Sequence, residues 1–83
     1  MSHIKIYSTS WCAFCKAEKE FLDQKGVTYE DVNVEEDQAA AQEMVKLTQQ
    51  MGVPVTRITH DDGSEVAIVG FDRDRLVHEL KLA

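Results

Sequence analysis

Two cysteines, Cys12 and Cys15, are the only sulfur nucleophiles in the chain, and two residues separate them. A disulfide between positions this close closes almost no loop, so it would stabilise the fold very little through chain entropy. Residues i and i+3 share one face of a helix, and their Cα atoms would lie near the roughly 5.5 Å that a disulfide prefers. The spacing therefore predicts a redox-active disulfide that forms and is reduced again, rather than a disulfide that stabilises the fold.

The surrounding sequence predicts different roles for the two cysteines. Cys12 lies where a strand is expected to give way to a helix, and the free N–H groups at a helix start stabilise an anion there. Lys16 adds a positive charge directly after Cys15. We expect Cys12 to be the attacking thiolate, and we expect Cys15, one turn inside the helix, to resolve the mixed disulfide formed with a substrate.

Two other interpretations of the cysteine pair are less favoured. A zinc site would need further ligands, but the sequence holds no second pair of this kind, and the histidines lack ligand spacing. Those histidines, His3, His60 and His78, are interpreted as surface or strand-end residues. Two buried cysteines with a purely structural role are less favoured still, and no bound metal is expected.

Hydrophobic periodicity and turn signals predict the elements that must position the pair. The expected strands are 3–8, 27–34, 55–59 and 64–69, the last two joined by the hairpin signal Asp62-Gly63. The expected helices are 13–25, 37–51 and 72–82, the first two ended by Gly26 and Gly52. Phe14 is expected on the buried face of the first helix. This βαβαββα order predicts an α/β fold in which helices cover both faces of a four-stranded mixed sheet, as one domain over 1–83.

Composition limits the functions that the chain can perform. Its 83 residues carry a net charge of −6, so nucleic acid and anionic membranes are poor partners. No apolar run approaches the roughly 18 residues of a membrane span, and the first residues do not form a secretory signal. We expect a reducing, cytoplasmic location, where a close cysteine pair is more often chemical than structural. A chain this short is also too small to carry a nucleotide-binding domain of its own.

Three segments of the sequence resemble the glutaredoxin-like redoxins of the thioredoxin-fold superfamily. They are 7–15 (YSTSWCAFC), 52–55 (GVPV) and 69–72 (VGFD), in the family's order and spacing. The resemblance implies a thioredoxin-like fold and a dithiol–disulfide oxidoreductase in which Cys12 attacks and Cys15 resolves. It also implies that Pro54 is cis and packs against the cysteines, while the Val53 backbone pairs with the substrate.

The resemblance further implies a substrate- or glutathione-binding surface around the cysteines. Its residues would be Trp11, Phe14, Lys16, Val53, Pro54, Gly70, Phe71 and Asp72. Asp72 matches the residue that holds the glutathione amine. Thr9 and Met51, however, stand where glutaredoxins usually carry basic residues that bind glutathione carboxylates, so weak glutathione dependence is expected.

Residues 70–76 are similar instead to the NrdH-type redoxins, which thioredoxin reductase reduces and which donate electrons to ribonucleotide reductase. The expected protein is a monomer without a bound cofactor that reduces disulfide-containing proteins, ribonucleotide reductase among the candidates. Its external reductant would be glutathione or thioredoxin reductase. The alternatives are a glutathione-dependent glutaredoxin proper, an iron–sulfur carrier that uses Cys12 and glutathione, and a binding module without redox chemistry.

Overall fold

A computed structural model describes residues 3–81 of the chain. The elements in this part are β1 (His3–Ser8), α1 (Ala13–Gln24), β2 (Glu30–Asn33), α2 (Gln38–Thr48), β3 (Val55–Thr59), β4 (Glu65–Val69) and α3 (Arg73–Leu80). The predicted βαβαββα order is confirmed. The last predicted helix reached to residue 82, which lies outside the described residues.

The strands form one mixed sheet in the order β2-β1-β3-β4. β1 pairs in parallel with β2, while β3 is antiparallel to both β1 and β4. Tyr7, near the end of β1, lies opposite Val55, the first residue of β3. The loop that leaves β1 and the loop that enters β3 therefore meet at one end of the sheet, and this brings Cys12 close to Pro54.

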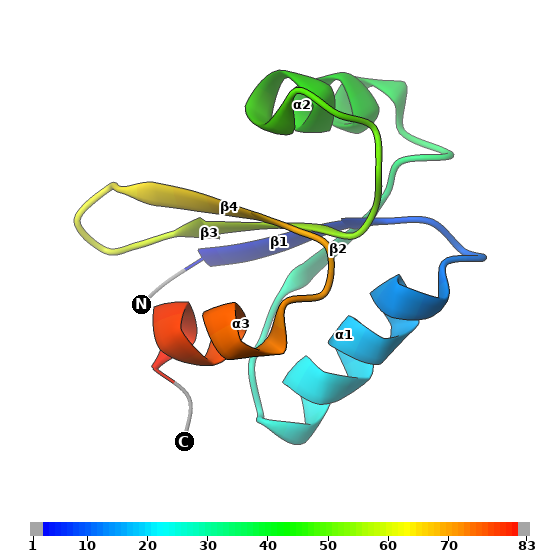
Figure 1. The fold of residues 1–83 in the computed structure, drawn as a ribbon. Helices are drawn as coiled ribbons and strands as arrows, with labels where there is room; N and C mark the ends of the chain where they lie inside the picture. The colour runs from blue at the N-terminus through cyan, green and yellow to red at the C-terminus, as the bar shows by residue number, and fades with distance from the viewer. Residues whose placement is uncertain (1–2, 82–83) are drawn as a thin grey trace.

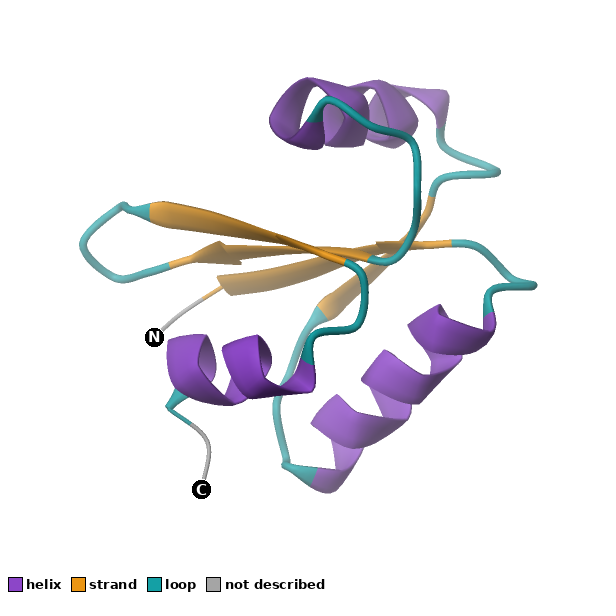
Figure 2. Ribbon diagram, in the orientation of Figure 1, coloured by secondary structure: helices purple, strands orange, loops and turns teal. Residues whose placement is uncertain are grey.

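Helices cover both faces of the sheet, as predicted. α1 and α3 lie against one face and α2 lies against the other (Figures 1 and 2). Alternate strand residues divide between the faces because successive side chains of a strand point in opposite directions. The larger buried cluster, on the face of α1 and α3, contains Ile4, Ile6, Phe21, Leu22, Ile58, Ile68 and Leu76. The smaller cluster, under α2, contains Tyr7, Ala40, Met44 and Val55.

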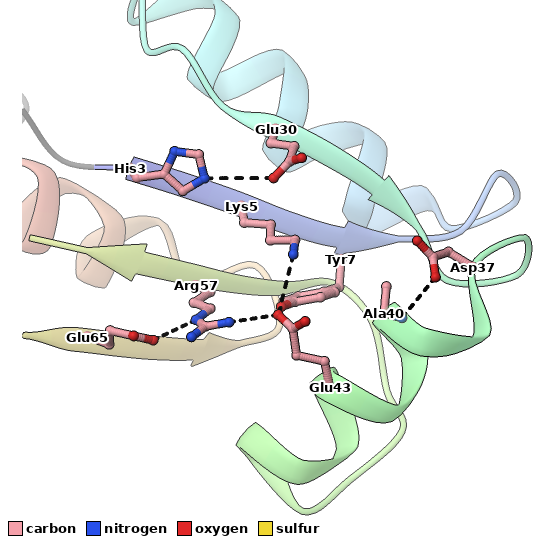
Figure 3. Close-up of polar contacts among 9 residues, drawn as sticks. All are labelled: His3, Lys5, Tyr7, Glu30, Asp37, Ala40, Glu43, Arg57 and Glu65. Atoms are coloured by element: carbon pink, nitrogen blue, oxygen red, sulfur yellow. Dashed lines mark hydrogen bonds and ion pairs between the residues drawn. The ribbon is translucent and has the colours of Figure 1, made fainter.

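A polar cluster ties α2 to its face of the sheet (Figure 3). Glu43 on α2 accepts hydrogen bonds from the Tyr7 hydroxyl and, at 2.7 Å, from Arg57, and its carboxylate lies 3.4 Å from Lys5 Nζ. Arg57 also pairs with Glu65 on β4 at 2.6 Å. The Tyr7 hydrogen bond, with the charges of Lys5 and Arg57, holds the pKa of Glu43 below its usual range. The cluster thus ties α2 directly to β1 and β3, and to β4 through Arg57.

The second strand is shorter than predicted. Residues 27–29 are loop, and β2 begins only at Glu30. The chain turns back sharply after α1, where the N–H of Val27 donates to the Leu22 carbonyl at 3.0 Å. Val27 and Tyr29 therefore pack against the larger core cluster from a loop, although their hydrophobic character suggested a strand.

The second helix also ends earlier than predicted. α2 stops at Thr48, and Gln49 adopts a left-handed conformation with a φ of 60°, so Gly52 is not the stop. The N–H of Gln49 donates to the Val45 carbonyl at 2.7 Å, which satisfies one of the carbonyls left open at a helix end. Met51 consequently lies in the loop before β3, where it is 79% exposed. None of the helices in residues 3–81 is long and apolar enough to cross a bilayer.

Candidate active site

Cys12 caps the N-terminus of α1. Its backbone is extended, with φ −88° and ψ 114°, and its sulfur accepts a hydrogen bond from the N–H of Cys15 at 3.1 Å. In most helices a side-chain oxygen satisfies an open N–H group in this way, and here the sulfur does so. The N–H groups and the dipole at a helix start both favour an anion, so a sulfur at this position is suited to act as a nucleophile. The side chain is only partly buried, so a disulfide can reach it.

Cys15 lies one turn inside α1 and is fully buried. Burial, with a further contribution from the hydrogen bond with Cys12, raises the pKa of the Cys15 thiol to about 12. A backbone hydrogen bond from Thr9 and the charge of Lys19 lower that pKa, with smaller effect. At neutral pH Cys15 is therefore a protonated thiol shielded from solvent. The two sulfurs thus differ in accessibility, since Cys12 is only partly buried and Cys15 is fully buried.

The loop before β3 completes the immediate surroundings of the cysteines. The peptide bond between Val53 and Pro54 is cis, as the resemblance implied. The carbonyl oxygen of Val53 lies 3.9 Å from the sulfur of Cys12. Gly70, which has a positive φ of 80°, donates its N–H to the Pro54 carbonyl at 2.8 Å and so ties the end of β4 to this loop. The structure thus brings Cys12, Val53, Pro54 and Gly70 together.

Three of the predicted binding residues form the exposed surroundings of the cysteines. Trp11 is 75% exposed and Phe14 is 68% exposed, and Lys16 is also exposed. The expectation that Phe14 packs in the core is wrong, because the buried face of α1 runs through Cys15, Glu18, Phe21 and Leu22. Phe14 precedes that face and points to solvent, where an aromatic ring can contact a partner.

The remaining two predicted binding residues, Phe71 and Asp72, make contacts within the fold itself. Phe71 packs against Phe21 on α1, with ring centroids 5.9 Å apart. Asp72 is the N-cap of α3, and its Oδ1 accepts the N–H of Arg75 at 3.1 Å. The Asp72 side chain is exposed. Binding of a glutathione amine by Asp72 stays a prediction.

Glu18 is a buried carboxyl one turn beyond Cys15 that we did not predict. Its side chain is 0% exposed; Oε2 accepts from the Thr56 hydroxyl, while Oε1 has no hydrogen-bond partner within residues 3–81. Burial raises the pKa of Glu18 to about 7. The hydrogen bond from Thr56 lowers that pKa, but by less than burial raises it. The spacing of Cys15, Glu18 and Leu22 is the sequence signal that places residue 18 on the buried face.

Glu35 is a second unpredicted residue beside the cysteines. It follows β2, and its carboxylate accepts hydrogen bonds from Ser10 and from the indole of Trp11. In the sequence it belongs to the acidic run 35–37, which is equally suited to the start of α2. Nothing in the local sequence signals a contact with residues 24 and 25 positions earlier.

The described residues contain no group of three or more His, Cys, Asp or Glu side chains arranged to hold a metal ion. Cys12 and Cys15 are both free thiols, so the groups present at this site are two sulfurs of unequal exposure. Such a pair can exchange with a disulfide and then close on itself. Thiol–disulfide exchange is therefore the chemistry that this arrangement supports.

Comparisons with known proteins agree with this chemistry. A family model described as glutaredoxin matches residues 4–62. A glutaredoxin-like 8.6 kDa protein in the rubredoxin operon of Clostridium pasteurianum is 44% identical over 79 residues, which cover 92% of this chain and 99% of that protein.

Solved structures are also similar to this chain over most of its length. The glutaredoxin-like protein NrdH-redoxin from Escherichia coli has a TM-score of 0.77 at 26% identity, with 92% of each chain covered. Methanosarcina acetivorans methanoredoxin has a TM-score of 0.81 at 29% identity, covering 94% of this chain and 83% of that one. From the family match, the relative and these structures we conclude that the chain belongs to the glutaredoxin family, thiol–disulfide oxidoreductases of the thioredoxin fold.

Proposed function

We propose that this protein is a small dithiol–disulfide oxidoreductase that reduces protein disulfides through Cys12 and Cys15. One observation supports the proposal above all others. The accessible sulfur of Cys12 receives an N–H hydrogen bond at the start of α1, while Cys15, one turn away, is fully buried. The first sulfur is suited to attack an external disulfide, and the second is suited to react only with the first.

The proposed reaction has two exchange steps. The Cys12 thiolate attacks one sulfur of the substrate disulfide, forms a mixed disulfide and releases the other substrate sulfur as a thiolate. Cys15 then loses its proton to solvent and attacks the Cys12 sulfur, which releases the second substrate thiolate and leaves a Cys12–Cys15 disulfide. Two electrons pass to the substrate, and an external reductant returns them to the protein. No bound metal or other cofactor takes part.

The high pKa of Cys15 is compatible with the second step. In the mixed disulfide Cys12 is no longer a thiolate, so its share of the raised pKa of Cys15 is removed and burial is the main cause that remains. Well-placed groups within one molecule reach effective concentrations of about 10⁵ M or more, which offsets a small thiolate fraction. The same high pKa keeps Cys15 from reacting before Cys12 has formed the mixed disulfide.

The surface around Cys12 suits a protein substrate. Trp11 and Phe14, on either side of Cys12 in the sequence, are large apolar side chains with exposed fractions of 75% and 68%. Exposed apolar groups gathered near a reactive centre are typical of a contact surface for another protein. We propose that an extended segment of the substrate pairs with the backbone at Val53, beside the Cys12 sulfur.

We propose thioredoxin reductase, rather than glutathione, as the main electron donor. Thr9 is buried and Met51 is apolar, so neither supplies a positive charge for the glutathione carboxylates. NrdH-redoxin from Escherichia coli is described as having a thioredoxin-like activity profile, and this chain has a similar structure. A cytoplasmic monomer that passes electrons to ribonucleotide reductase or another disulfide-containing protein is the corresponding cellular role.

A comparison of the two donors tests this assignment. Oxidised protein is incubated either with glutathione or with thioredoxin reductase and NADPH, and the regained protein thiols are counted over time. We expect fast recovery with the reductase and slow recovery with glutathione. Fast recovery with glutathione alone would contradict the donor assignment and would indicate a glutathione-dependent glutaredoxin.

Met51→Arg is the matched variant for this comparison. Residue 51 is exposed, so an arginine fits there without disturbing the core. A new positive charge near a bound glutathione carboxylate should raise the glutathione rate by about three- to tenfold. An unchanged glutathione rate would show that residue 51 does not contribute to glutathione binding.

A further inference from the structure

Glu35 connects the turn after β2 to the residues directly before Cys12. Its Oε1 accepts hydrogen bonds from the backbone N–H of Ser10 at 2.8 Å and from the Ser10 hydroxyl at 2.9 Å. Its Oε2 accepts the indole Nε1–H of Trp11 at 3.0 Å. Both carboxylate oxygens are thus committed to the two residues that precede the attacking cysteine.

The segment that carries Glu35 is itself held in place. The N–H of Glu35 donates to the Asn33 side chain at 2.9 Å, and the N–H of Val34 donates to the Ser8 carbonyl at 2.9 Å. Glu35 is therefore anchored to the ends of β1 and β2 on one side and to the Trp11 loop on the other. A side chain held this way can favour one direction of the exposed indole, because a charge-assisted hydrogen bond is shorter and stronger than a neutral one.

The Glu35 carboxylate also carries charge at the edge of the site. The three hydrogen bonds hold the pKa of Glu35 below its usual range, so it is ionised at neutral pH. The same carboxylate accepts the indole N–H of Trp11 at 3.0 Å, so its negative charge lies at the edge of the site next to Trp11.

We propose that Glu35 is a positioning and specificity residue, which fixes Trp11 beside Cys12 and disfavours anionic disulfides, glutathione disulfide among them. The proposal rests on the proposed disulfide reduction and adds a reason for weak glutathione use that is independent of Thr9 and Met51. A substrate would meet the apolar face of a fixed indole together with a negative charge. Partners with neutral or cationic groups near their disulfide would be preferred.

A charge series of small disulfides tests the specificity part of the proposal. Reduced protein is mixed at low ionic strength with glutathione disulfide, which is anionic, with bis(2-hydroxyethyl) disulfide, which is neutral, or with cystamine, which is cationic. The loss of protein thiols in a single turnover gives each rate. The rate ratios are the readout, because a loosened loop would lower all three rates together.

Glu35→Gln removes the charge and nearly keeps the shape of the side chain. Two unit charges about 6 Å apart in water change a rate about threefold, so the ratio of the glutathione disulfide rate to the cystamine rate should rise about tenfold. The wild-type ratio should approach that of the variant when added salt screens the charge. Glu36→Gln is the matched control, because the Glu36 carboxylate is exposed and has no hydrogen-bond partner in the described part of the chain. We expect it to change the ratio by less than about threefold.

Fluorescence of the protein's single tryptophan, Trp11, tests the positioning part. Glu35→Asp keeps the charge but is one methylene shorter, so it cannot reach both Ser10 and Trp11. We expect the Asp variant to keep the wild-type rate ratio, whereas both variants should raise acrylamide quenching and lower the anisotropy of Trp11.

The outcomes separate this proposal from the one on which it rests. If wild-type protein loses no thiols to any of the three disulfides, disulfide reduction itself is wrong, and the role of Glu35 in specificity is overturned with it. If wild-type protein reacts but Glu35→Gln leaves the rate ratio unchanged, only the specificity role is overturned. Unchanged Trp11 fluorescence in both variants would overturn the positioning role.

Discussion

Replacing Cys12 by serine is expected to abolish disulfide reduction. The serine hydroxyl is a far weaker nucleophile than a thiolate, so the single-turnover rate with a model disulfide should fall by at least about 10³-fold. Serine is also a good helix N-cap, and its hydroxyl can accept the N–H of residue 15 as the Cys12 sulfur does. The loss therefore follows from chemistry rather than from unfolding.

Circular dichroism and urea unfolding provide the control for Cys12→Ser. The free energy of unfolding should stay within about 1 kcal/mol of the wild-type value, because the N-cap hydrogen bond is retained. A folded Cys12→Ser protein that reduces disulfides at the wild-type rate would contradict the assignment of Cys12 as nucleophile.

Replacing Glu18 by glutamine is expected to shift the difference in unfolding free energy between variant and wild type by about 2.5 kcal/mol in favour of the variant from pH 5 to pH 8. In the folded protein the pKa of Glu18 is raised to about 7 from an ordinary value of 4.5, because the carboxyl is buried. Folding therefore favours the protonated form. The stability that this group contributes is fully present below about pH 4.5 and is lost as the pH rises through about 7.

Glutamine cannot ionise, and it can still accept a hydrogen bond from the Thr56 hydroxyl as Glu18 does. Urea unfolding at pH 5 and at pH 8 should therefore show a difference between variant and wild type that grows with pH. Other titrating groups affect both proteins alike and cancel in that difference. Glu20→Gln, at an exposed position of the same helix, is the matched control and should stay within about 0.5 kcal/mol of wild type. A variant-to-wild-type difference that does not change with pH would mean that Glu18 does not titrate in this range.

Most of the fold could be predicted from the sequence because local signals agree with the tertiary structure. Residues 3–8 alternate as a strand and form β1, and the hairpin signal Asp62-Gly63 lies between β3 and β4 as expected. The errors lie where tertiary packing overrides hydrophobic pattern. Val27 and Tyr29 pack from a loop, and the end of α2 is set by a left-handed Gln49 rather than by a glycine.

The centre of the site could be predicted, but its edge could not. The spacing of Cys12 and Cys15 and their place at a helix start are local properties, and the resemblance added Val53 and Pro54. The bond between Glu35 and Trp11 joins residues 24 positions apart, and it depends on how the turn after β2 lies against the loop after β1. No periodicity or spacing in a single sequence encodes such a contact between two loops.

The measurement that tests the central claim most directly is mass spectrometry of Cys15→Ser protein after reaction with a model disulfide. Without the resolving thiol, the mixed disulfide cannot be released from within the protein, so the account predicts a stable adduct that maps to Cys12. Wild-type protein treated in the same way should carry no adduct and should contain a Cys12–Cys15 disulfide. A Cys15→Ser protein that forms no adduct at Cys12 would contradict the claim that Cys12 attacks and Cys15 resolves.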